Sequence, residues 1–578
     1  MTTAGPAPTP DGLSKVERIK RTSAQLRGTI AQELAQETDQ FSETSVQLNK
    51  FHGIYQQDDR DRRQAARASG QAKAYSMMIR VRIPGGVVSP DAYLAHDQLA
   101  REYGNGTLRV TTRQDFQLHG VLKGDLRPAI RAINATLLTT LGGCGDVERN
   151  IMICPAPAQD RLRQEVTAVL AKLVPALAPS AGAYHEIWLD GELASSSALA
   201  ADPLYGDSYL PRKFKTAVAL EGDNCVDVYA NDLGLVAVPT DDRGLAGFVV
   251  LVGGGMGRTH NRPETFAALA TPIGLTSPDR VLEVCRAVIM VQRDHGDRSN
   301  RRQARLKYLI AARGLDWFRD EVETRVGFQF APAPALAWPA IDDHLGWHQQ
   351  GDRSAFLGLH IDNGRIEDSD QGHLGTALRR LVATLRPGVR LTPQQNLILT
   401  GIETHRRAEV DQLLADHGVA LAEELHSARR NAMACPALPT CGLALAEAER
   451  AMPELVGRLS RLMDELDLGR EQISYRMTGC PNGCTRPYLG DVGLVGTTLG
   501  KYDLLLGGDS SGTRLNWAYA QNVPFIEIVE VLRGPLRLYA AARRPGERFG
   551  EWCHEVGPER LAALVAADAN HVTRSQDG

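Results

Sequence analysis

The sequence predicts a mixed α/β protein of the α+β class, built from two related halves in a pseudo-twofold arrangement. Two internal repeats indicate this. LRVTTRQDFQLHGV at 108–121 matches VRLTPQQNLILTGI at 389–402 at five of fourteen positions, and NDLGLVAV at 231–238 resembles GDVGLVGT at 490–497. Because the repeats occur in the same order and at similar separations, we expect a chain duplicated as A–B–A′–B′, with a ligand between the halves.

Each A copy should form a β–α–β unit. A strand-like run is followed by a helical pattern and then by the repeated strand-like segment. The segments are 76–86, 90–104 and 108–121 in the first copy, and 355–366, 373–385 and 389–402 in the second.

Each B copy carries an apolar strand that ends in paired glycines, VVLVGG at 249–254 and LLLGG at 504–508. In the first copy, the Ser-Pro-Asp sequence at 277–279 has the residue types that cap and begin a helix, so a helix should start there. Two cysteine-containing loops occur only in the second copy, which predicts that the copies have diverged in function.

We expect an N-terminal extension ahead of the duplicated region. Its first ten residues are rich in Pro and Thr and should be disordered, and residues 13–37 have the pattern of a helical segment that is polar on most faces. A folded region should begin near Phe51. The expected boundaries are 1–50 for the extension and 51–135, 136–340, 341–425 and 426–578 for A, B, A′ and B′.

Composition excludes several classes of protein. With 578 residues, 43% hydrophobic and 23% charged, the chain can bury several cores, and its net charge of −4 argues against a general nucleic-acid or anionic-membrane binder. No apolar run approaches the roughly 20 residues that span a bilayer. The N-terminus lacks the apolar core of a signal peptide, so the cytoplasm is the expected location, where cysteines stay reduced.

Four of the nine cysteines lie in ACPALPTCG at 434–442 and TGCPNGCTRP at 478–487. Zinc sites favour C-x2-C spacing and often use histidine, and ferredoxins also space their cysteines more closely. Four thiolates without histidine suit a soft iron–sulfur site, and the prolines and glycines would hold the loops open so that backbone N–H groups face sulfide. The composition favours iron–sulfur and leaves zinc or no metal open.

The paired cysteine motif resembles the cluster-binding signature of assimilatory sulfite and nitrite reductases. HGIYQQDDRD, YLPRKFK, LVGGGMGRTH and GERFGEW extend the resemblance over nearly the whole chain. It implies a three-lobed molecule with two ferredoxin-like half-domains and two siroheme and iron–sulfur domains. It also implies a four-iron four-sulfur (4Fe-4S) cluster that is bridged to a siroheme through Cys484. The implied cluster ligands are Cys435, Cys441, Cys480 and Cys484.

Several basic residues are candidates for binding anions. Arg80 and Arg82 are two residues apart, as are Lys213 and Lys215, so each pair would share one face of a strand. In the resemblance, the residues that bind substrate are Arg80, Arg149, Lys213 and Lys215. Those that bind siroheme are Arg113, Gln117, His119, Arg212, Arg305 and Asn482, together with Cys484. Taken alone, His119 would be an ordinary core or surface histidine.

The resemblance implies the six-electron reduction of sulfite to sulfide. Lys215 occupies a position where the nitrite reductases of the family tend to carry asparagine, which favours sulfite because a dianion gains more from an added cation. The alternative is a siroheme nitrite reductase that forms ammonia. An electron-transfer iron–sulfur protein and a zinc-stapled binding protein also stay open.

Electrons should come from another protein. VGGGMGR at 252–258 lacks the G-x-G-x-x-G pattern of a dinucleotide site, so no nucleotide or flavin site is expected in this chain. The donor is a ferredoxin or an NADPH-dependent flavoprotein subunit, and the motifs resemble the ferredoxin-dependent members more. In some of those relatives, a cysteine placed like Cys144 is linked to a tyrosine, here Tyr55; a free thiol is the favoured state.

Overall fold

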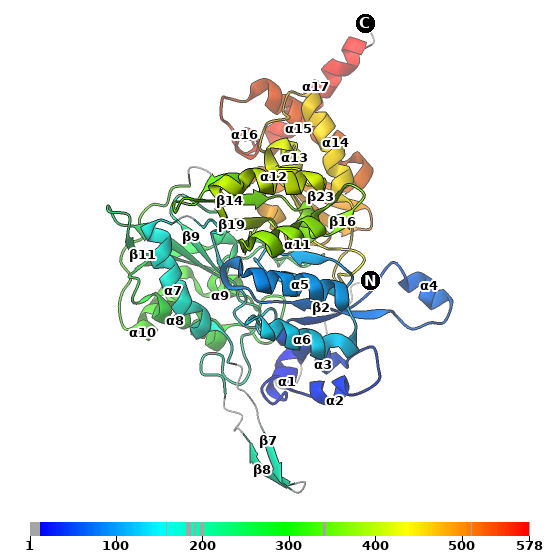
Figure 1. The fold of residues 1–578 in the computed structure, drawn as a ribbon. Helices are drawn as coiled ribbons and strands as arrows, with labels where there is room; N and C mark the ends of the chain where they lie inside the picture. Colours follow the sequence, from blue (N-terminus) through cyan, green and yellow to red (C-terminus); the bar gives the residue numbers. More distant parts are fainter. Residues whose placement is uncertain are drawn as a thin grey trace.

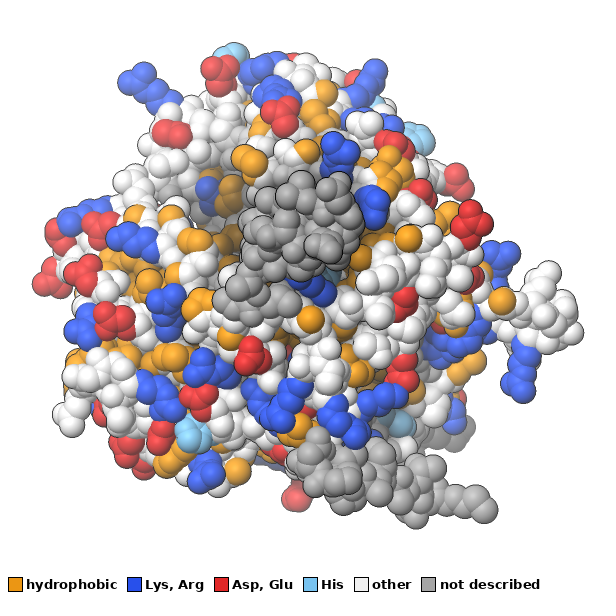
Figure 2. Space-filling model, turned by 90° about the horizontal axis from the view of Figure 1, so that it is seen from below, with side chains coloured by type: hydrophobic (Ala, Val, Ile, Leu, Met, Phe, Trp, Pro, Cys, Tyr) orange, Lys and Arg blue, Asp and Glu red, His pale blue; other side chains and the backbone are white. Residues whose placement is uncertain are grey.

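The computed structural model describes residues 12–157, 159–180, 186–189, 192–196, 201–338, 343–509 and 511–576. The first ten residues, expected to be disordered, lie outside these ranges. Within them, none of the helices combines the length and the apolar character that a membrane span requires. Figure 2 shows basic and acidic side chains interspersed over one face, which fits the small net charge of −4.

The two A copies form two sheets of five strands each. The first has the order β1 (Ile54–Asp58), β2 (Tyr75–Arg80), β5 (Phe116–Val121), β4 (Leu108–Val110) and β15 (Arg365–Ile366). The second has the order β13 (Gly346–Gln349), β14 (Ser354–Leu359), β19 (Leu397–Glu403), β18 (Gly388–Leu391) and β3 (Val87–Val88). The predicted β–α–β order is confirmed in both copies.

The two sheets exchange their last strands. β15 comes from the second copy and pairs with β4 of the first, while β3 comes from the first copy and pairs with β18 of the second. Helices α5 (Pro90–Glu102) and α11 (Leu374–Leu385) contact each other, and both copies share one apolar core. Because each copy completes the sheet of the other, A and A′ form a single unit at the centre of the molecule (Figure 1).

The sequence repeated between the A copies forms the same turn in each copy. Gln114 and Gln395 both have positive φ, 57° and 68°. The N–H of each glutamine closes its turn, by donating to the Thr111 carbonyl in one copy and to the Thr392 carbonyl in the other, both at 3.1 Å. The side chains hold the turns in place: Gln114 Nε2 donates to the Leu391 carbonyl at 2.8 Å, and Gln395 Nε2 to the Asn363 carbonyl at 3.0 Å. The short repeat in the sequence therefore reflects a true structural duplication.

The B copies are also duplicates of each other. The B sheet runs β6 (Met152–Ile153), β9 (Thr216–Leu220), β10 (Leu233–Pro239), β11 (Leu245–Val252) and β12 (Thr271–Thr276). The B′ sheet runs β20 (Ala432–Ala434), β21 (Tyr475–Thr478), β22 (Val492–Thr498), β23 (Lys501–Leu506) and β24 (Trp517–Pro524). In both, the first three strands are parallel and the last two are antiparallel. Side chains that follow the first two strands therefore meet at one sheet edge.

Helices cover these sheets on the outer sides of the molecule. α7 (Arg161–Leu177) packs against β11 and α8 (Val281–His295) in B, and α14 (Met452–Glu465) packs against β20 and α15 (Ile528–Ala542) in B′. In Figure 1 the B helices lie at the lower left and the B′ helices at the top, with α5 and α11 between them.

Two predictions about helices are wrong. The segment at 13–37 forms two short helices, α1 (Lys15–Arg21) and α2 (Ile30–Leu34), and it packs onto B through the buried Ile19 and Leu26. One of its charged residues, Lys20, is also buried, and its ammonium group donates to the Leu210 carbonyl at 2.7 Å. The helix expected after the Ser-Pro-Asp sequence is present as α8, but its predicted start is wrong: it begins at Val281 rather than after Ser277, because the Ser277 carbonyl first closes a turn with the Arg280 N–H.

The paired cations also differ from the expected strand pairs. β2 ends at Arg80, and Arg82 lies beyond it in a single bridge to Thr139. Lys213 and Lys215 precede β9, which begins at Thr216. The alternation of side chains along a strand therefore does not apply to either pair.

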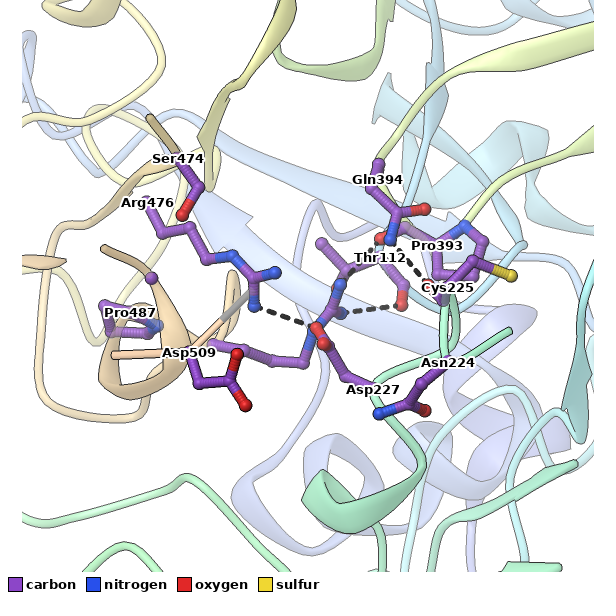
Figure 3. A network of polar contacts seen from close by, with 12 residues as sticks. Thr112, Asn224, Cys225, Asp227, Pro393, Gln394, Ser474, Arg476, Pro487 and Asp509 are labelled. Atoms are coloured by element: carbon purple, nitrogen blue, oxygen red, sulfur yellow. Dashed lines mark hydrogen bonds and ion pairs between the residues drawn. The ribbon is translucent and has the colours of Figure 1, made fainter. Parts of the chain in front are cut away.

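A buried ion pair joins all four units. Asp227, in the loop before β10, contacts Arg476 of β21 at 2.8 Å and also pairs with Arg486 (Figure 3). Arg486 in turn donates to the carbonyls of Thr112 in A at 3.2 Å and Pro393 in A′ at 2.9 Å. Burial raises the pKa of Asp227, but the two guanidiniums more than offset this and hold it below its usual value. The carboxylate is therefore charged at neutral pH.

We predict that Asp227→Asn destabilises the whole molecule. Removing one partner of a buried ion pair leaves the other charge uncompensated, at a cost of about 3–5 kcal/mol. The midpoint of thermal unfolding, measured by circular dichroism, should fall by several degrees. Glu409→Gln, which removes an exposed partner of Arg406, is the control and should leave the midpoint unchanged. Equal midpoints for both variants would contradict the importance of this contact.

Candidate functional site

The four expected cluster ligands converge at one edge of the B′ sheet. Cys435 directly follows β20, Cys480 lies two residues after β21, and Cys441 and Cys484 complete the two loops. The loops touch, since the Gly479 N–H donates to Cys435 Sγ at 3.4 Å. A Cβ at Gly479 would lie 2.5 Å from the Ala446 carbonyl oxygen and 2.6 Å from Ala437 Cβ, so this approach requires glycine.

The four sulfurs are close enough to influence one another's ionisation. Burial raises the pKa of Cys435 well above its usual value, and the neighbouring thiolates of Cys484, Cys480 and Cys441 add to the rise. Burial and Cys484 likewise raise the pKa of Cys480 to about 11. Neighbouring thiols of this kind ionise together only when a cationic centre offsets their charge, so the group is suited to bind metal.

The spacing of the sulfurs separates a cluster from a single ion. Among the described residues, three or more His, Cys or carboxylate ligand atoms lie within 4.8 Å of one another only at Cys154, Asp223, Cys225 and His344. No three sulfurs of the B′ loops are therefore that close. A tetrahedral zinc with Zn–S bonds of about 2.3 Å needs sulfurs about 3.8 Å apart. The four cysteines of B′ therefore do not form the compact group that a single zinc ion requires.

Arg80 lies at the end of β2 and faces this group. Its Nη1 donates to Cys144 Sγ at 2.8 Å. Burial lowers the pKa of Arg80, but Cys144, Tyr55 and smaller influences that include Cys484 more than offset this and raise it. Gln117, with its amide oxygen turned towards Arg80, accepts from Nε at 3.0 Å. Tyr55 lies beside Cys144, and burial followed by this neighbouring cysteine raises the pKa of Tyr55 to about 12. Cys144 is a free thiol in the structure.

Lys213 and Lys215 lie in a region of uncompensated positive charge. Burial lowers the pKa of Lys213 well below its usual value, and Arg212, Arg305 and Arg149 lower it further, while only Cys484 opposes them among the main influences. Burial and then Lys213 itself lower the pKa of Lys215 in the same way. A bound anion would relieve this repulsion, so the region is suited to an anionic ligand beside Cys484.

Unpartnered buried donors support this interpretation. The Nε atoms of Arg113 and Arg149 and the Nδ1 atom of His119 are buried and have no hydrogen-bond partner within the described part of the chain. Burial and nearby arginines hold the pKa of His119 well below its usual value, so its ring is neutral. Because buried polar atoms are normally hydrogen-bonded, these positions fit a polar, anionic group such as the carboxylates of a siroheme.

Several of the predicted cofactor residues also have protein partners, and Arg113 has them through its other nitrogen atoms. Arg113 donates to Asn231 Oδ1 at 2.9 Å, and Arg305 pairs with Asp232 at 2.6 Å. Asn482 Nδ2 lies 3.5 Å from Cys480 Sγ and thus points at the cysteine group. Burial followed by the charge of Arg301 lowers the pKa of Arg212 to about 10. Their roles toward a cofactor stay predictions.

Sequence reasoning missed two contributors to this site. Thr112 Oγ1 donates to the Cys484 carbonyl at 3.0 Å, so the A turn directly supports the cysteine loop. The glycine-rich segment at 252–258 also lies against that loop, through an Arg258 N–H bond to the Pro481 carbonyl at 2.8 Å. Lys307 shapes this segment by donating to the carbonyls of Gly255 and Gly257, each at 2.9 Å. The run of glycines at 252–258 was the available signal, but it was compared only with a nucleotide-binding pattern, which it does not match, and no loop contact was predicted from it.

Comparisons with known proteins agree with this geometry. The family model described as "Nitrite and sulphite reductase 4Fe-4S domain" matches residues 171–330 and 426–572, and the "Nitrite/Sulfite reductase ferredoxin-like half domain" matches residues 69–136 and 348–417.

Curated relatives match over nearly the whole chain. "Sulfite reductase [ferredoxin]" of Synechococcus elongatus is 45% identical over 96% of this chain and 91% of its own length. "Sulfite reductase [NADPH] hemoprotein beta-component" of Chromohalobacter salexigens is 45% identical over 95% of this chain and 96% of its own.

A solved structure shares the fold. The Mycobacterium tuberculosis NirA protein superposes with a TM-score of 0.77 at 24% identity, and the match covers 95% of this chain and 97% of that one. With both domain types matched twice and relatives at 45% identity, the chain belongs to the nitrite and sulphite reductase family.

Proposed function

We propose that this protein is an assimilatory sulfite reductase that reduces sulfite to sulfide. The observation that carries the proposal is that Lys213, Lys215 and Arg149 lie close to one another and that Lys213 lies near Cys484, in a region where cations outnumber opposing charges. Sulfite is a small dianion, so it is the kind of ligand that these cations would stabilise. Two relatives that are 45% identical over nearly the whole chain carry the name sulfite reductase.

Two cofactors fit the side chains at this junction. Cys435, Cys441, Cys480 and Cys484 would hold a 4Fe-4S cluster, and Cys484 would also be shared with a siroheme. The carboxylates of the siroheme would contact Arg113, Gln117, His119, Arg212, Arg305 and Asn482. When bound, the two groups supply single-electron transfer and an iron that takes the sulfur atom of the substrate.

The residues of this chain would bind the substrate and deliver protons. Arg80, Arg149, Lys213 and Lys215 would neutralise the anion and stabilise charge on the oxygen atoms that leave. The lowered pKa values of Lys213 and Lys215 also make their ammonium groups readier proton donors near neutral pH. A bound anion raises the pKa of each lysine. Binding of sulfite would therefore favour the protonated lysines, which would then donate their protons during its reduction.

Nitrite reduction is the second candidate function. Nitrite carries one negative charge, and sulfite as a dianion gains more from the fourth cation, Lys215. A simple electron-transfer protein would have no use for four cations at its cluster, and the spacing of the sulfurs argues against a zinc staple in B′.

We predict that Lys215→Asn reduces sulfite turnover more than nitrite turnover. Loss of one preorganised donor lowers kcat by roughly 10²-fold in other enzymes, and the loss should be smaller for the monoanion. The measurement is kcat with each anion and reduced methyl viologen as donor. Lys501→Asn, at an exposed position of β23, is the matched control. An equal loss with both anions would argue against a role of Lys215 in discrimination.

We also predict that Cys484→Ser abolishes the coupled chromophore. A serine oxygen is a poor ligand for a soft iron–sulfur centre, so the cluster and the siroheme would lose their shared atom. The visible absorption spectrum of the purified variant should change, while Cys553→Ser, a buried cysteine of α16 (Phe549–Val556), should retain the spectrum of the wild type. An unchanged spectrum in Cys484→Ser would contradict the proposal that Cys484 is the shared ligand.

The electron donor in this proposal is a ferredoxin. Relatives named for ferredoxin and for NADPH match at the same 45% identity, so the choice depends on the motifs shared with ferredoxin-dependent members. The chain should form sulfide with reduced ferredoxin alone and form none with NADPH unless a flavoprotein is added.

The cytoplasm is the proposed location, in keeping with nine cysteines that are all free thiols.

A further inference from the structure

A second group of metal-binding side chains lies outside the site described above. Cys154, Asp223, Cys225 and His344 place one ligand atom each within 4.8 Å of all the others. Cys154 Sγ lies 2.8 Å from Asp223 Oδ2 and 3.4 Å from His344 Nε2, and that nitrogen lies 3.5 Å from Asp223 Oδ2. Both cysteines and the histidine are buried. Four ligand atoms thus converge on one point inside the protein.

The position of this group repeats that of the B′ cysteines. Cys154 directly follows β6, the first strand of the B sheet, just as Cys435 directly follows β20 in B′. The surrounding sequences agree, MICPA at 152–156 and MACPA at 433–437, and their separation of 281 residues equals that of the A repeats.

Cys225 corresponds in the same way to Cys484. Leu233 of β10 pairs with Thr216, and its counterpart Val492 of β22 pairs with Tyr475, which fixes the register between B and B′. In this register Cys225 falls on Cys484, and Asp227 falls on Arg486, both with positive φ of 48° and 55°. The expectation that cysteine loops occur only in B′ is therefore wrong: B retains two of the four cysteines at the same sheet edge.

We propose that Cys154, Asp223, Cys225 and His344 bind one zinc ion. Two sulfurs, one imidazole nitrogen and one carboxylate oxygen are ligands that zinc accepts, and four protein ligands describe a closed, structural site. A tetrahedral zinc places such atoms about 3.4–3.8 Å apart, close to two of the three measured separations. The third, between Cys154 Sγ and Asp223 Oδ2, needs to open by about 1 Å. In contrast to B′, the group is compact enough for a single ion.

The surroundings of the group favour its metal-binding form. Asp223 is oriented by the Cys225 N–H, which donates to its Oδ1 at 3.0 Å and leaves Oδ2 facing the other ligands. Arg163 lies 3.9 Å from Cys154 Sγ and 3.8 Å from Asp223 Oδ2, and so offsets part of the negative charge of two thiolates and a carboxylate. Metal binding would release the thiol protons to solvent.

The zinc would connect two units of the molecule. Cys154, Asp223 and Cys225 belong to B, whereas His344 lies in the segment that enters A′ at β13. The same B loop is held to A′ by Gln394, whose Nε2 donates to the Cys225 carbonyl at 2.5 Å, while the Cys225 sulfur points away from Asp227 (Figure 3). The ion would therefore stabilise the B–A′ contact on the side of the Asp227 loop opposite to B′.

The direct test measures zinc in the wild-type protein with its cofactors. Protein expressed with added zinc and dialysed against EDTA should retain about one zinc per chain by plasma mass spectrometry. Zinc K-edge absorption, which iron does not obscure, should show about two sulfurs near 2.3 Å and two nitrogen or oxygen atoms near 2.0–2.2 Å. Absence of zinc in this protein, a shell without sulfur, or a Cys154–Cys225 disulfide in the mass spectrum would each overturn the proposal.

Variants assign the zinc to these residues. Cys225→Ser and Asp223→Asn should lower the zinc content at least ~10-fold, and the milder Asp223→Asn keeps the test valid if the serine variant does not fold. Cys285→Ser, at a buried cysteine of α8, is the matched control and should retain the metal. The iron content and visible spectrum should be the same in the control and in Asp223→Asn. Full zinc in both ligand variants would exclude this site.

Discussion

The buried contact of Asp227 with Arg476 and Arg486 is the constraint on which the rest of the structure depends. One carboxylate from B pairs with two guanidiniums from B′, and Arg486 lies two residues after Cys484. The same guanidinium reaches the backbone of A and of A′. The position of the cysteine loop is therefore fixed by contacts to every other unit, so the site forms only when the four units are assembled.

Duplication supplies both the site and its asymmetry. In each half, two parallel strands deliver their following residues to one sheet edge, and in each half that edge gathers cysteines. B′ holds four sulfurs at a spacing too wide for one ion, whereas B holds two sulfurs, a carboxylate and an imidazole in a compact group. Asp227 and Arg486, which occupy equivalent positions, have become the two partners of one ion pair. A pseudo-twofold fold thereby acquires one redox half and one structural half.

The cations show how an anion site arises from packing rather than from a strand pattern. Lys213 and Lys215 approach the junction from an irregular segment, and their neighbours are mostly other cations. Buried charged side chains such as Arg305 have a partner of opposite charge, here Asp232. Among the described residues, no such ion pair is formed by Lys213 or Lys215. The imbalance costs stability in the protein alone, and a bound anion would recover it.

Much of this was predictable from the sequence because it depends on local patterns. The β–α–β units follow from hydrophobic periodicity, and the A repeat marks a turn in which Gln114 and Gln395 need positive φ. The convergence of the four cysteines was accessible through their spacing and the family resemblance. Other predictions were wrong because they depend on tertiary contacts. Lys20 is buried in a segment whose polar pattern indicated exposure to solvent, and Lys213 and Lys215 precede β9 rather than lying in a strand. Cys154 and Cys225 appeared to be isolated, because their relation to Cys435 and Cys484 is visible only in the strand register.

The stoichiometry of the reaction tests the central claim most directly. The purified chain with its cofactors, given sulfite and a measured amount of a reduced one-electron donor, should consume about six electrons for each sulfide released, the difference between sulfur(IV) and sulfur(−II). Oxidation of the donor without sulfide, or no sulfite-dependent oxidation at all, would contradict the assignment of the four-cysteine junction as a sulfite-reducing site.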